Sequence, residues 1–300
     1  MKKKLLYLLI LCVLFLIFLG LAYFNVQIKK DNASLNIYQN PILFTPANYP
    51  FIDGLAPEIS AEAAVVIDKN SMISLYEKNS TFRLPPASTT KIMTALVALE
   101  HYSPSDILTI YEPYTEGSVL KLQEGEQFIF ESLLYAMMLP SSNDATLAIA
   151  QNYPSGEKGF VQRMNEMALE LRLLNTYYED PVGLMDEKDY TTSFDLARLT
   201  AIALDNPEFA KIVSTREKTI ANIKGKEYKL ESLNVLLGLP GINGVKTGYT
   251  EGAGQVLVTS KKLENGGELI FVVMQSQDRF GDTMALLNYL EKINYLSIHP

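Results

Sequence analysis

Three serines in this 300-residue chain are each followed, three positions later, by a lysine. On a helix, positions i and i+3 are neighbours, so such a lysine can contact the serine hydroxyl. If the lysine is neutral at working pH, it can take the hydroxyl proton and make the serine a nucleophile. Chance alone yields this pattern in a chain of ordinary composition, so the surrounding sequence must decide among the pairs. The pairs are Ser88–Lys91, Ser118–Lys121 and Ser155–Lys158.

The surrounding sequence favours Ser88. This serine follows the stretch Pro85–Ala87 and opens a run whose apolar residues fall mostly on one face of a helix. Ser118 and Ser155 lie in stretches that contain Gly or Pro, and no helical periodicity directly follows them. The N-terminus of a helix at Ser88 would stabilise a developing anion. Taken alone, Ser88 is also explained as the cap of that helix.

Two further motifs place polar side chains at the ends of predicted elements. The stretch Ser141–Asn143 follows a proline and precedes a predicted helix, where Asn143 or Asp144 could simply cap the helix. The stretch Lys246–Gly248 precedes a predicted strand, where an ordinary turn is the alternative. In the order Ser-x-x-Lys, Ser-x-Asn, Lys-Thr-Gly, the three motifs together match the set found in penicillin-interacting serine enzymes.

The scarcity of histidine and cysteine excludes other hydrolytic machinery. The chain has two histidines, His101 and His299, and one cysteine, Cys12. A catalytic zinc site usually takes two or three histidine ligands, so we expect neither a metal nor any other cofactor. Cys12 lies in an apolar run, which makes it a poor candidate nucleophile, and one cysteine cannot form an internal disulfide. Hydrolysis by this chain would therefore use neither cysteine, nor zinc, nor a triad centred on histidine.

The N-terminus predicts a membrane anchor. Leu5–Phe24 is an apolar run of 20 residues behind three lysines, and a helix of that length spans about 30 Å of hydrocarbon. We expect residues 1–24 to remain uncleaved, with the N-terminus cytoplasmic and the rest extracytoplasmic, at a bacterial cell surface or in a periplasm. Residues 25–57 are predicted to be a polar tether, and residues 58–300 a single catalytic domain.

The charge of the chain limits its partners. The formal net charge is −8, and without the anchor lysines the exported part is more acidic still. An acidic surface repels polyanions, so nucleic acid is not expected as a partner.

The periodicity of apolar residues predicts an α+β fold. Four short strands are predicted near the two ends of the exported domain, at Ala63–Asp68, Met72–Glu77, Gln255–Ser260 and Glu268–Met274. After the helix that begins near Ser88, further helical patterns cover Ser132–Leu139, Asp144–Gln151, Gly159–Leu174, Ser193–Leu204 and Met284–Ile293. We therefore expect an antiparallel sheet built from both ends of the domain, with a helical region inserted between them.

Four separated blocks of sequence point to one protein family. They are PPASTTKIMTALVALE (Pro85–Glu100), MMLPSSNDATLAIA (Met137–Ala150), NTYYEDPVGL (Asn175–Leu184) and GINGVKTGYTEGAGQVLVTS (Gly241–Ser260). In order and spacing they resemble the D-alanyl-D-alanine carboxypeptidases, the low-molecular-weight penicillin-binding proteins of the S11 serine peptidase family. The resemblance extends from about residue 62 to residue 290. It implies the fold shared by serine β-lactamases and penicillin-binding proteins.

The resemblance also implies a role for each motif residue. Ser88 would be the nucleophile, with Lys91 as its base and Ser141 as a proton relay. To act as a base, Lys91 must lose its proton, and we expect burial and the charge of Lys246 to lower its pKa. Backbone N–H groups, those of Ser88 and Tyr249, would form the oxyanion hole. The residues implied to bind substrate are Asn143 at an amide, and Lys246, Thr247, Gly248 and Arg279 at the terminal carboxylate. Arg279 is alternatively a solvated surface side chain.

The implied activity is removal of the terminal D-Ala from peptidoglycan stem pentapeptides through a Ser88 acyl-enzyme, which β-lactams would also acylate. Two alternatives are related enzymes, a DD-endopeptidase and a β-lactamase. A β-lactamase of class A activates the deacylating water with a Glu that lies in a loop four residues before an Asn. The nearest pair in this chain, Glu170 and Asn175, is one residue too far apart, and Glu170 lies in a helical pattern. Another is a catalytically idle protein that binds muropeptides.

Two departures from the family are expected to matter. The chain leaves no room for a second domain, and Ser142 stands where Gly or Ala is common, so its side chain is expected to intrude and slow the reaction.

Overall fold

The computed structural model describes residues 49–52, 55–264, 266–290 and 293–296. The predicted anchor, residues 1–24, and most of the predicted tether, residues 25–57, lie outside these ranges. Among the described residues, no helix combines the length and the apolar character needed to cross a bilayer. The proposed anchor therefore stays a prediction.

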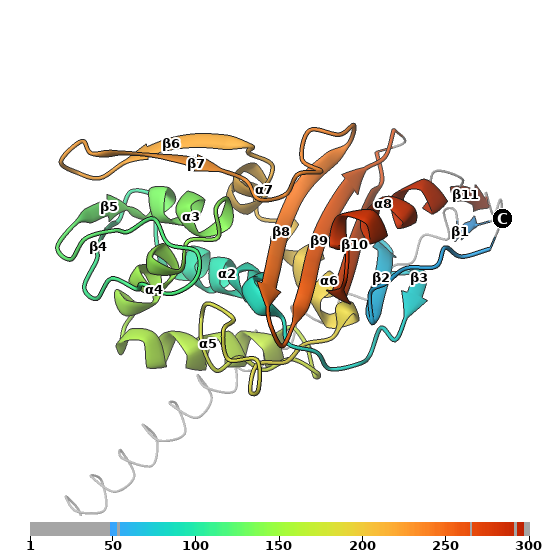
Figure 1. Ribbon diagram of the computed structural model, residues 1–300, viewed down its shortest axis with the longest axis horizontal. Helices are drawn as coiled ribbons and strands as arrows, with labels where there is room; N and C mark the ends of the chain where they lie inside the picture. Colours follow the sequence, from blue (N-terminus) through green and yellow to red (C-terminus); the bar gives the residue numbers. More distant parts are fainter. Residues whose placement is uncertain (1–48, 53–54, 265, 291–292, 297–300) are drawn as a thin grey trace, which may run out of the picture. The chain divides into compact units, whose positions relative to one another are not determined.

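A five-stranded antiparallel sheet forms the framework (Figure 1), and it confirms the predicted fold class. The strand order is β3-β2-β10-β9-β8. Two of these strands come from the N-terminal part of the described chain and three from its C-terminal part, as expected. Their bounds are Ala63–Asp68 (β2), Ser74–Lys78 (β3), Ile242–Thr250 (β8), Gly254–Lys262 (β9) and Glu268–Ser276 (β10). β8 is an edge strand, and β9 is its partner in the sheet.

Both faces of the sheet are covered, because successive side chains of a strand point to opposite sides. In β10, Ile270 and Val272 belong to the larger core, on the side of α6 (Ser193–Leu204). Phe271 and Val273 instead join Leu286 in a second core under α8 (Arg279–Leu290). The continuous apolar runs of β2 and β10 follow from this two-sided burial.

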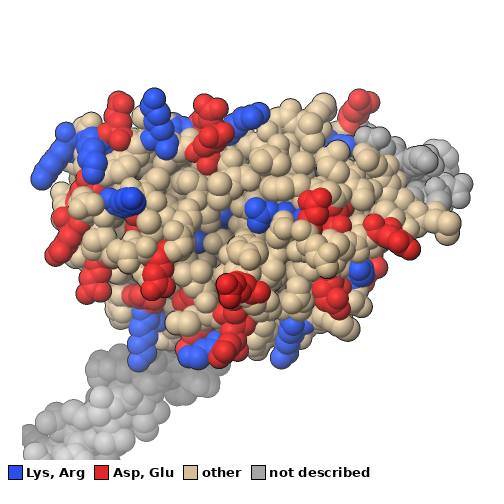
Figure 2. Space-filling model, in the orientation of Figure 1, with Lys and Arg blue, Asp and Glu red and all other residues tan. Residues whose placement is uncertain are grey.

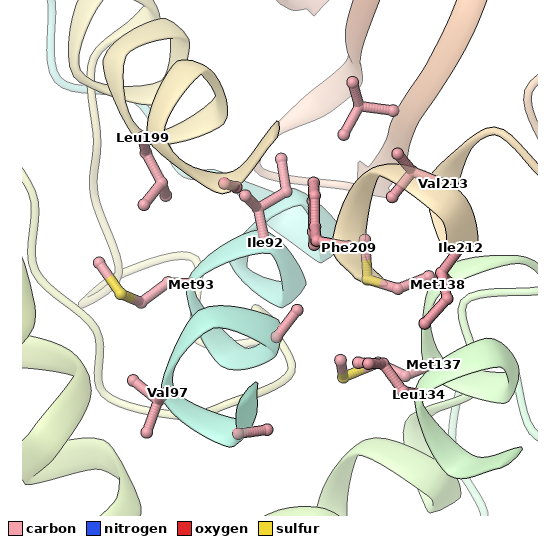
Figure 3. Close-up of a cluster of buried hydrophobic side chains, with 14 of the residues drawn as sticks. Ile92, Met93, Val97, Leu134, Met137, Met138, Leu199, Phe209, Ile212 and Val213 are labelled. Atoms are coloured by element: carbon pink, nitrogen blue, oxygen red, sulfur yellow. The ribbon is translucent and has the colours of Figure 1, made fainter. Parts of the chain in front are cut away.

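The helical region packs against one face of the sheet around a core of apolar side chains. Its helices are η1 (Ala87–Thr90), α2 (Lys91–His101), α3 (Phe130–Met138), α4 (Asn143–Gln151), α5 (Gly156–Glu170) and α7 (Pro207–Val213). Figure 3 shows buried apolar side chains on several sides of α2: Met137 of α3 and Leu199 of α6 lie on opposite sides of the helix, and Phe209 of α7 lies beside Ile92. Helix α2, which follows the predicted nucleophile, is thereby fixed by packing on several sides.

Three small two-stranded sheets complete the described chain. They pair β1 (Tyr49–Ile52) with β11 (Ile293–Leu296), β4 (Ile107–Thr109) with β5 (Gln127–Ile129), and β6 (Glu217–Ala221) with β7 (Glu227–Glu231).

The predicted elements are confirmed for the most part. The strand Ala63–Asp68 and the helix Ser193–Leu204 have the expected bounds, and the last helix begins earlier, at Arg279. One expectation is wrong: the helix predicted from Gly159 begins at Gly156, so Ser155 directly precedes α5, although no helical periodicity was expected directly after it. The backbone of Ser155 is left-handed, with a φ of 66°, and its side chain does not form the hydrogen bond by which a serine usually caps a helix.

Asp282 on α8 fastens the start of the domain to the sheet. Its carboxylate, 7 % exposed, accepts hydrogen bonds from the backbone N–H groups of Ser60 and Ala61 and from the hydroxyls of Ser60 and Ser276. We expect Asp282→Asn to lower the free energy of unfolding by about 2 kcal/mol. The amide NH2 group of the asparagine would face donors that now bind a carboxylate oxygen, so those hydrogen bonds would be lost. Urea unfolding at neutral pH measures this change.

The pH dependence of that loss provides a second check. Burial alone would raise the pKa of Asp282, but the hydrogen bonds from Ser276, Ser60 and Ala61 lower it overall. Because the pKa of Asp282 is lower in the folded than in the unfolded state, its ionised carboxylate stabilises the folded protein at pH values above the unfolded pKa, about 4. This stabilisation disappears as the pH falls through the pKa of the folded state. The difference between wild type and Asp282→Asn should shrink below about pH 4. Asp205→Ala, which breaks an exposed pair with Lys69, should have little effect.

Candidate active site

Ser88 lies in η1, and Lys91 is the first residue of α2. Lys91 Nζ lies 2.9 Å from Ser88 Oγ, so the tetrad forms the contact that its spacing predicts. Neither η1 nor α2 has a side-chain cap, and the cap positions belong to Pro86 and Thr90. The alternative interpretation of Ser88 as a helix cap is therefore wrong.

The Lys91 amine is surrounded by oxygen atoms. Besides Ser88 Oγ, its Nζ lies 2.9 Å from Asn143 Oδ1 and 3.2 Å from the carbonyl oxygen of Val182. The side chain is fully buried, and burial lowers the pKa of Lys91 to about 7, against the opposing effect of the Asp180 charge. The expected effect of burial is confirmed. The charges of Lys91 and Lys246 interact, and this interaction lowers the pKa of Lys246.

The Ser-Ser-Asn motif leads into α4. Asn143 places its Oδ1 on Lys91, and its Nδ2 donates to the carbonyl of Glu116 at 3.0 Å. Ser141 has a left-handed backbone with a φ of 64°, and its buried hydroxyl has no hydrogen-bond partner within the described part of the chain. The expected intrusion of Ser142 is wrong: its hydroxyl accepts from Ala145 N as the N-cap of α4.

The Lys-Thr-Gly motif is part of the edge strand β8 and forms no turn, because Lys246 and Thr247 pair with Val258 and Leu257 of β9. Gly248 lies directly against η1: a Cβ built on it would be 3.1 Å from Ser88 N. Its neighbour Tyr249 has an exposed side chain, at 63 %.

Two cations lie beside this strand. Lys246 is buried and donates to the carbonyl of Thr247 at 3.0 Å. Burial, reinforced by the charges of Lys91 and Arg279, lowers the pKa of Lys246 well below its ordinary value. Arg279 is half-buried and donates from Nη1 to the carbonyl of Gly248 at 2.8 Å, and burial lowers its pKa too. Neither cation forms an ion pair with an acidic side chain of the described residues.

A loop that sequence reasoning left without a role supports Lys91 from the other side. Within the loop 180–185, the carbonyls of Pro181 and Val182 accept from Thr94 Oγ1 at 2.6 Å and from Lys91 Nζ at 3.2 Å. Gly183 has a φ of 84° and packs on η1. The Gly in the block Asn175–Leu184 was a usable signal for a left-handed turn, but nothing in the sequence said what the turn would contact.

The two other Ser-x-x-Lys tetrads form no comparable site. Ser118 Oγ donates to the carbonyl of Pro140 at 2.6 Å, and Lys121 is exposed. Ser155 and Lys158 are both exposed. The structure thus separates the three pairs by burial, since one lysine alone among them is removed from water.

The charges around the site are unevenly arranged. Figure 2 shows Lys and Arg atoms in the middle of one face, with acidic side chains both beside them and farther out on that face. No group of three or more metal-ligating side chains occurs among the described residues. The arrangement can therefore activate a serine with a buried amine and attract an anionic group beside it.

Comparisons with known proteins agree with this geometry. The family model of the S11 peptidases, described as D-alanyl-D-alanine carboxypeptidase, matches residues 53–278. The chain is 35 % identical over 237 residues to the D-alanyl-D-alanine carboxypeptidase DacF of Bacillus subtilis, an alignment that covers 75 % of this chain and 60 % of that protein. It is 33 % identical over 248 residues to a D-alanyl-D-alanine endopeptidase of Pseudomonas aeruginosa, covering 79 % of each chain.

A solved structure shows the same fold. The crystal structure of the Streptomyces K15 DD-transpeptidase superposes with a TM-score of 0.74 at 30 % identity, covering 79 % of this chain and 98 % of that one. The chain spans about 60 % of the length of Bacillus subtilis DacF and 58 % of Haemophilus influenzae DacA. Since the family model covers most of the chain and the fold agrees, this protein belongs to the S11 family of D-alanyl-D-alanine carboxypeptidases.

Proposed function

We propose that this protein is a serine D-alanyl-D-alanine carboxypeptidase that removes the terminal D-Ala from peptidoglycan stem pentapeptides. The observation that carries the proposal is the environment of Lys91. A neutral amine has two N–H bonds and one lone pair. The oxygens of Asn143 and Val182 accept the two N–H groups, which leaves the lone pair directed at Ser88 Oγ. Lys91 is thereby arranged as the base for Ser88.

The reaction then proceeds through an acyl-enzyme. Lys91 takes the hydroxyl proton as Ser88 Oγ attacks the carbonyl carbon between the two D-Ala residues. The oxyanion receives hydrogen bonds from the backbone N–H groups of Ser88 and Tyr249, and Asn143 binds an amide of the substrate. The proton passes from Lys91 through the Ser141 hydroxyl to the departing D-Ala amine. Water then hydrolyses the ester and regenerates Ser88.

The terminal carboxylate is recognised by the cations beside β8. Lys246 and Arg279 lie in or against the protein interior without an acidic partner among the described residues, an arrangement that costs free energy until an anion arrives. A carboxylate would raise the pKa of Lys246 back toward its ordinary value and restore its charge. Thr247 and Gly248 continue the same strand and complete this subsite.

The protein meets its substrate outside the cytoplasm. Residues 1–24 act as an uncleaved membrane anchor, and residues 25–57 hold the catalytic domain away from the bilayer. β-Lactams, which present a reactive amide and a carboxylate, acylate Ser88 in place of the peptide. The apolar run and its three flanking lysines support this assignment.

One of the alternative functions loses support in the structure. A β-lactamase needs a carboxylate to activate the deacylating water, and Glu170, the closest sequence candidate, is held by Arg163 Nη1 at 2.8 Å. The endopeptidase alternative keeps a specific observation in its favour, because the relative from Pseudomonas aeruginosa carries that name. Comparing the hydrolysis of a cross-linked muropeptide with that of a pentapeptide separates the two activities.

The full-length chain, purified in detergent, tests the main proposal with two substrates. We expect D-Ala release from diacyl-Lys-D-Ala-D-Ala, and covalent labelling by a fluorescent penicillin on the peptide that contains Ser88, identified by mass spectrometry. Labelling of another residue would contradict the proposed nucleophile. Labelling of Ser88 without D-Ala release would instead favour the muropeptide-binding alternative.

The proposal also predicts how acylation depends on pH. Because burial lowers the pKa of Lys91 to about 7, the neutral amine predominates above that pH. We expect the acid limb of the penicillin acylation profile to rise with pH, with a midpoint near 7, as the base loses its proton. Stopped-flow fluorescence from acidic to strongly alkaline pH measures the profile. A midpoint near the ordinary value of lysine would exclude Lys91 as the buried base.

A further inference from the structure

Asp180 organises the loop that contacts Lys91. Its Oδ1 accepts from the backbone N–H groups of Val182 at 2.5 Å and Gly183 at 2.6 Å, and its Oδ2 accepts from those of Leu184 and Met185 at 3.0 Å each. Four N–H donors on one carboxyl suit an ionised group. The shape of the loop, and therefore the place of the Val182 carbonyl, depends on Asp180.

Asp189 brings a second carboxyl group to the same place. Its backbone N–H donates to the Met185 carbonyl at 2.8 Å, which closes the turn after the loop. Its Oδ1 accepts from Glu179 N at 2.6 Å. Its Oδ2 is buried, and as an acceptor it has no hydrogen-bond partner among the described residues. Asp180 interacts with Asp189 through its charge, its side chain and its backbone N–H, and Asp189 is 2 % exposed.

The other groups around Asp189 supply no compensating positive charge. Those that interact with it or lie beside it are Asp180, Tyr178, Asp195, Glu179 and Lys188. Lys188 is exposed and pairs with Glu179 at 3.1 Å, so its charge is directed away from the buried carboxyl groups. Burial, and then the charge of Asp180, raise the pKa of Asp189 to about 8.

We propose that Asp189 is a protonated positioning residue, whose carboxylic acid donates from Oδ2 to Asp180 and holds the Val182 carbonyl in place on Lys91. A proton between the two groups satisfies the otherwise unpartnered oxygen and removes the repulsion of two buried charges. Loss of this proton at alkaline pH disturbs the loop, moves Val182 and slows acylation. The inference rests on the proposed function, in which Lys91 is the base.

The chain offers a conservative variant that separates this role from a merely structural one. In Asp189→Asn, the amide Nδ2 donates permanently to Asp180, while Oδ1 still accepts from Glu179 N. We expect acylation by penicillin within about twofold of wild type at neutral pH. The loss of rate that we expect of wild type above about pH 8 should disappear in this variant or move upward by about one unit. Asp189→Ala, which has no donor, should be slower at every pH, by about 10-fold.

Asp195→Asn is the matched control, because Asp195 lies near the same Tyr178 but accepts instead from Asn175 N and the Thr176 hydroxyl. It should leave the alkaline loss of rate unchanged. An alkaline loss in Asp189→Asn equal to that of wild type would overturn the inference.

A second measurement does not depend on activity. The ¹³C NMR titration of the Asp189 carboxyl in the full-length wild type, assigned by its absence from the spectrum of Asp189→Asn, should show a midpoint near 8. A midpoint in the ordinary range of aspartate, about 4, would refute the protonated state even if acylation is normal. A failure of all acylation with the NMR midpoint near 8 would contradict the proposed function and leave the protonated pair supported.

Discussion

Replacement of Lys91 by methionine is expected to lower the rate of Ser88 acylation by about 10³-fold, the usual contribution of a general base. Methionine has a similar length and no proton-accepting nitrogen, so the buried volume stays filled while the base is lost. The two oxygens that accept from Lys91, on Asn143 and Val182, lose a donor, which adds a modest loss of stability. Acylation by a fluorescent penicillin under single-turnover conditions measures the rate.

The chain contains its own control for this substitution. Lys158 follows Ser155 with the same spacing, but both side chains are exposed. Lys158→Met should therefore leave acylation within about twofold of wild type. If Lys91→Met and Lys158→Met had the same rate, Lys91 would not be the base. If Lys91→Met were inactive and also unfolded by circular dichroism, Lys91→Arg, which keeps a donor but cannot deprotonate, would decide the question.

The residues of the site were predictable where chemistry fixes their spacing. Ser88 and Lys91 are close in sequence, so a single helical turn brings them together. Asn143 and Lys246 reach the same place through long-range packing, which residue spacing does not encode, and the resemblance to the family was needed to group them. The loop around Asp180 could not be predicted from spacing at all. Its function depends on a backbone carbonyl, that of Val182, and any residue type carries one.

The fold was predictable for a related reason. Strand β2 is a continuous apolar run and helix α6 has apolar residues at helical spacing, because each is buried against other elements, and their predicted bounds agree with the structure. The pairs β4–β5 and β6–β7 have short strands whose polar residues give little alternation, so they were missed. For the Lys-Thr-Gly motif a turn was the alternative interpretation, and glycine is indeed uncommon inside strands. Here the glycine is required by the close approach of η1.

Gly183→Ala is expected to be the most damaging change outside the reacting residues. Gly183 has a φ of 84°, and an added Cβ would lie 2.0 Å from the Ala87 carbonyl oxygen and 2.7 Å from Thr90 Oγ1. Because the nearest obstacle is backbone, the loop must move away from η1 and carry the Val182 carbonyl off Lys91. We expect a loss of about 3 kcal/mol in the free energy of unfolding and at least about 10-fold in acylation rate.

Gly225→Ala separates the clash from the strain. Gly225 has nearly the same φ, 85°, but nothing lies within 4 Å of an added Cβ. Its substitution should therefore carry the cost of a left-handed alanine alone, about 1 kcal/mol, and should leave acylation unchanged. Urea unfolding and penicillin acylation of both variants make the comparison. If Gly183→Ala were no worse than Gly225→Ala in both measurements, the loop would not be held by contact with η1, and Val182 would not depend on that contact to reach Lys91.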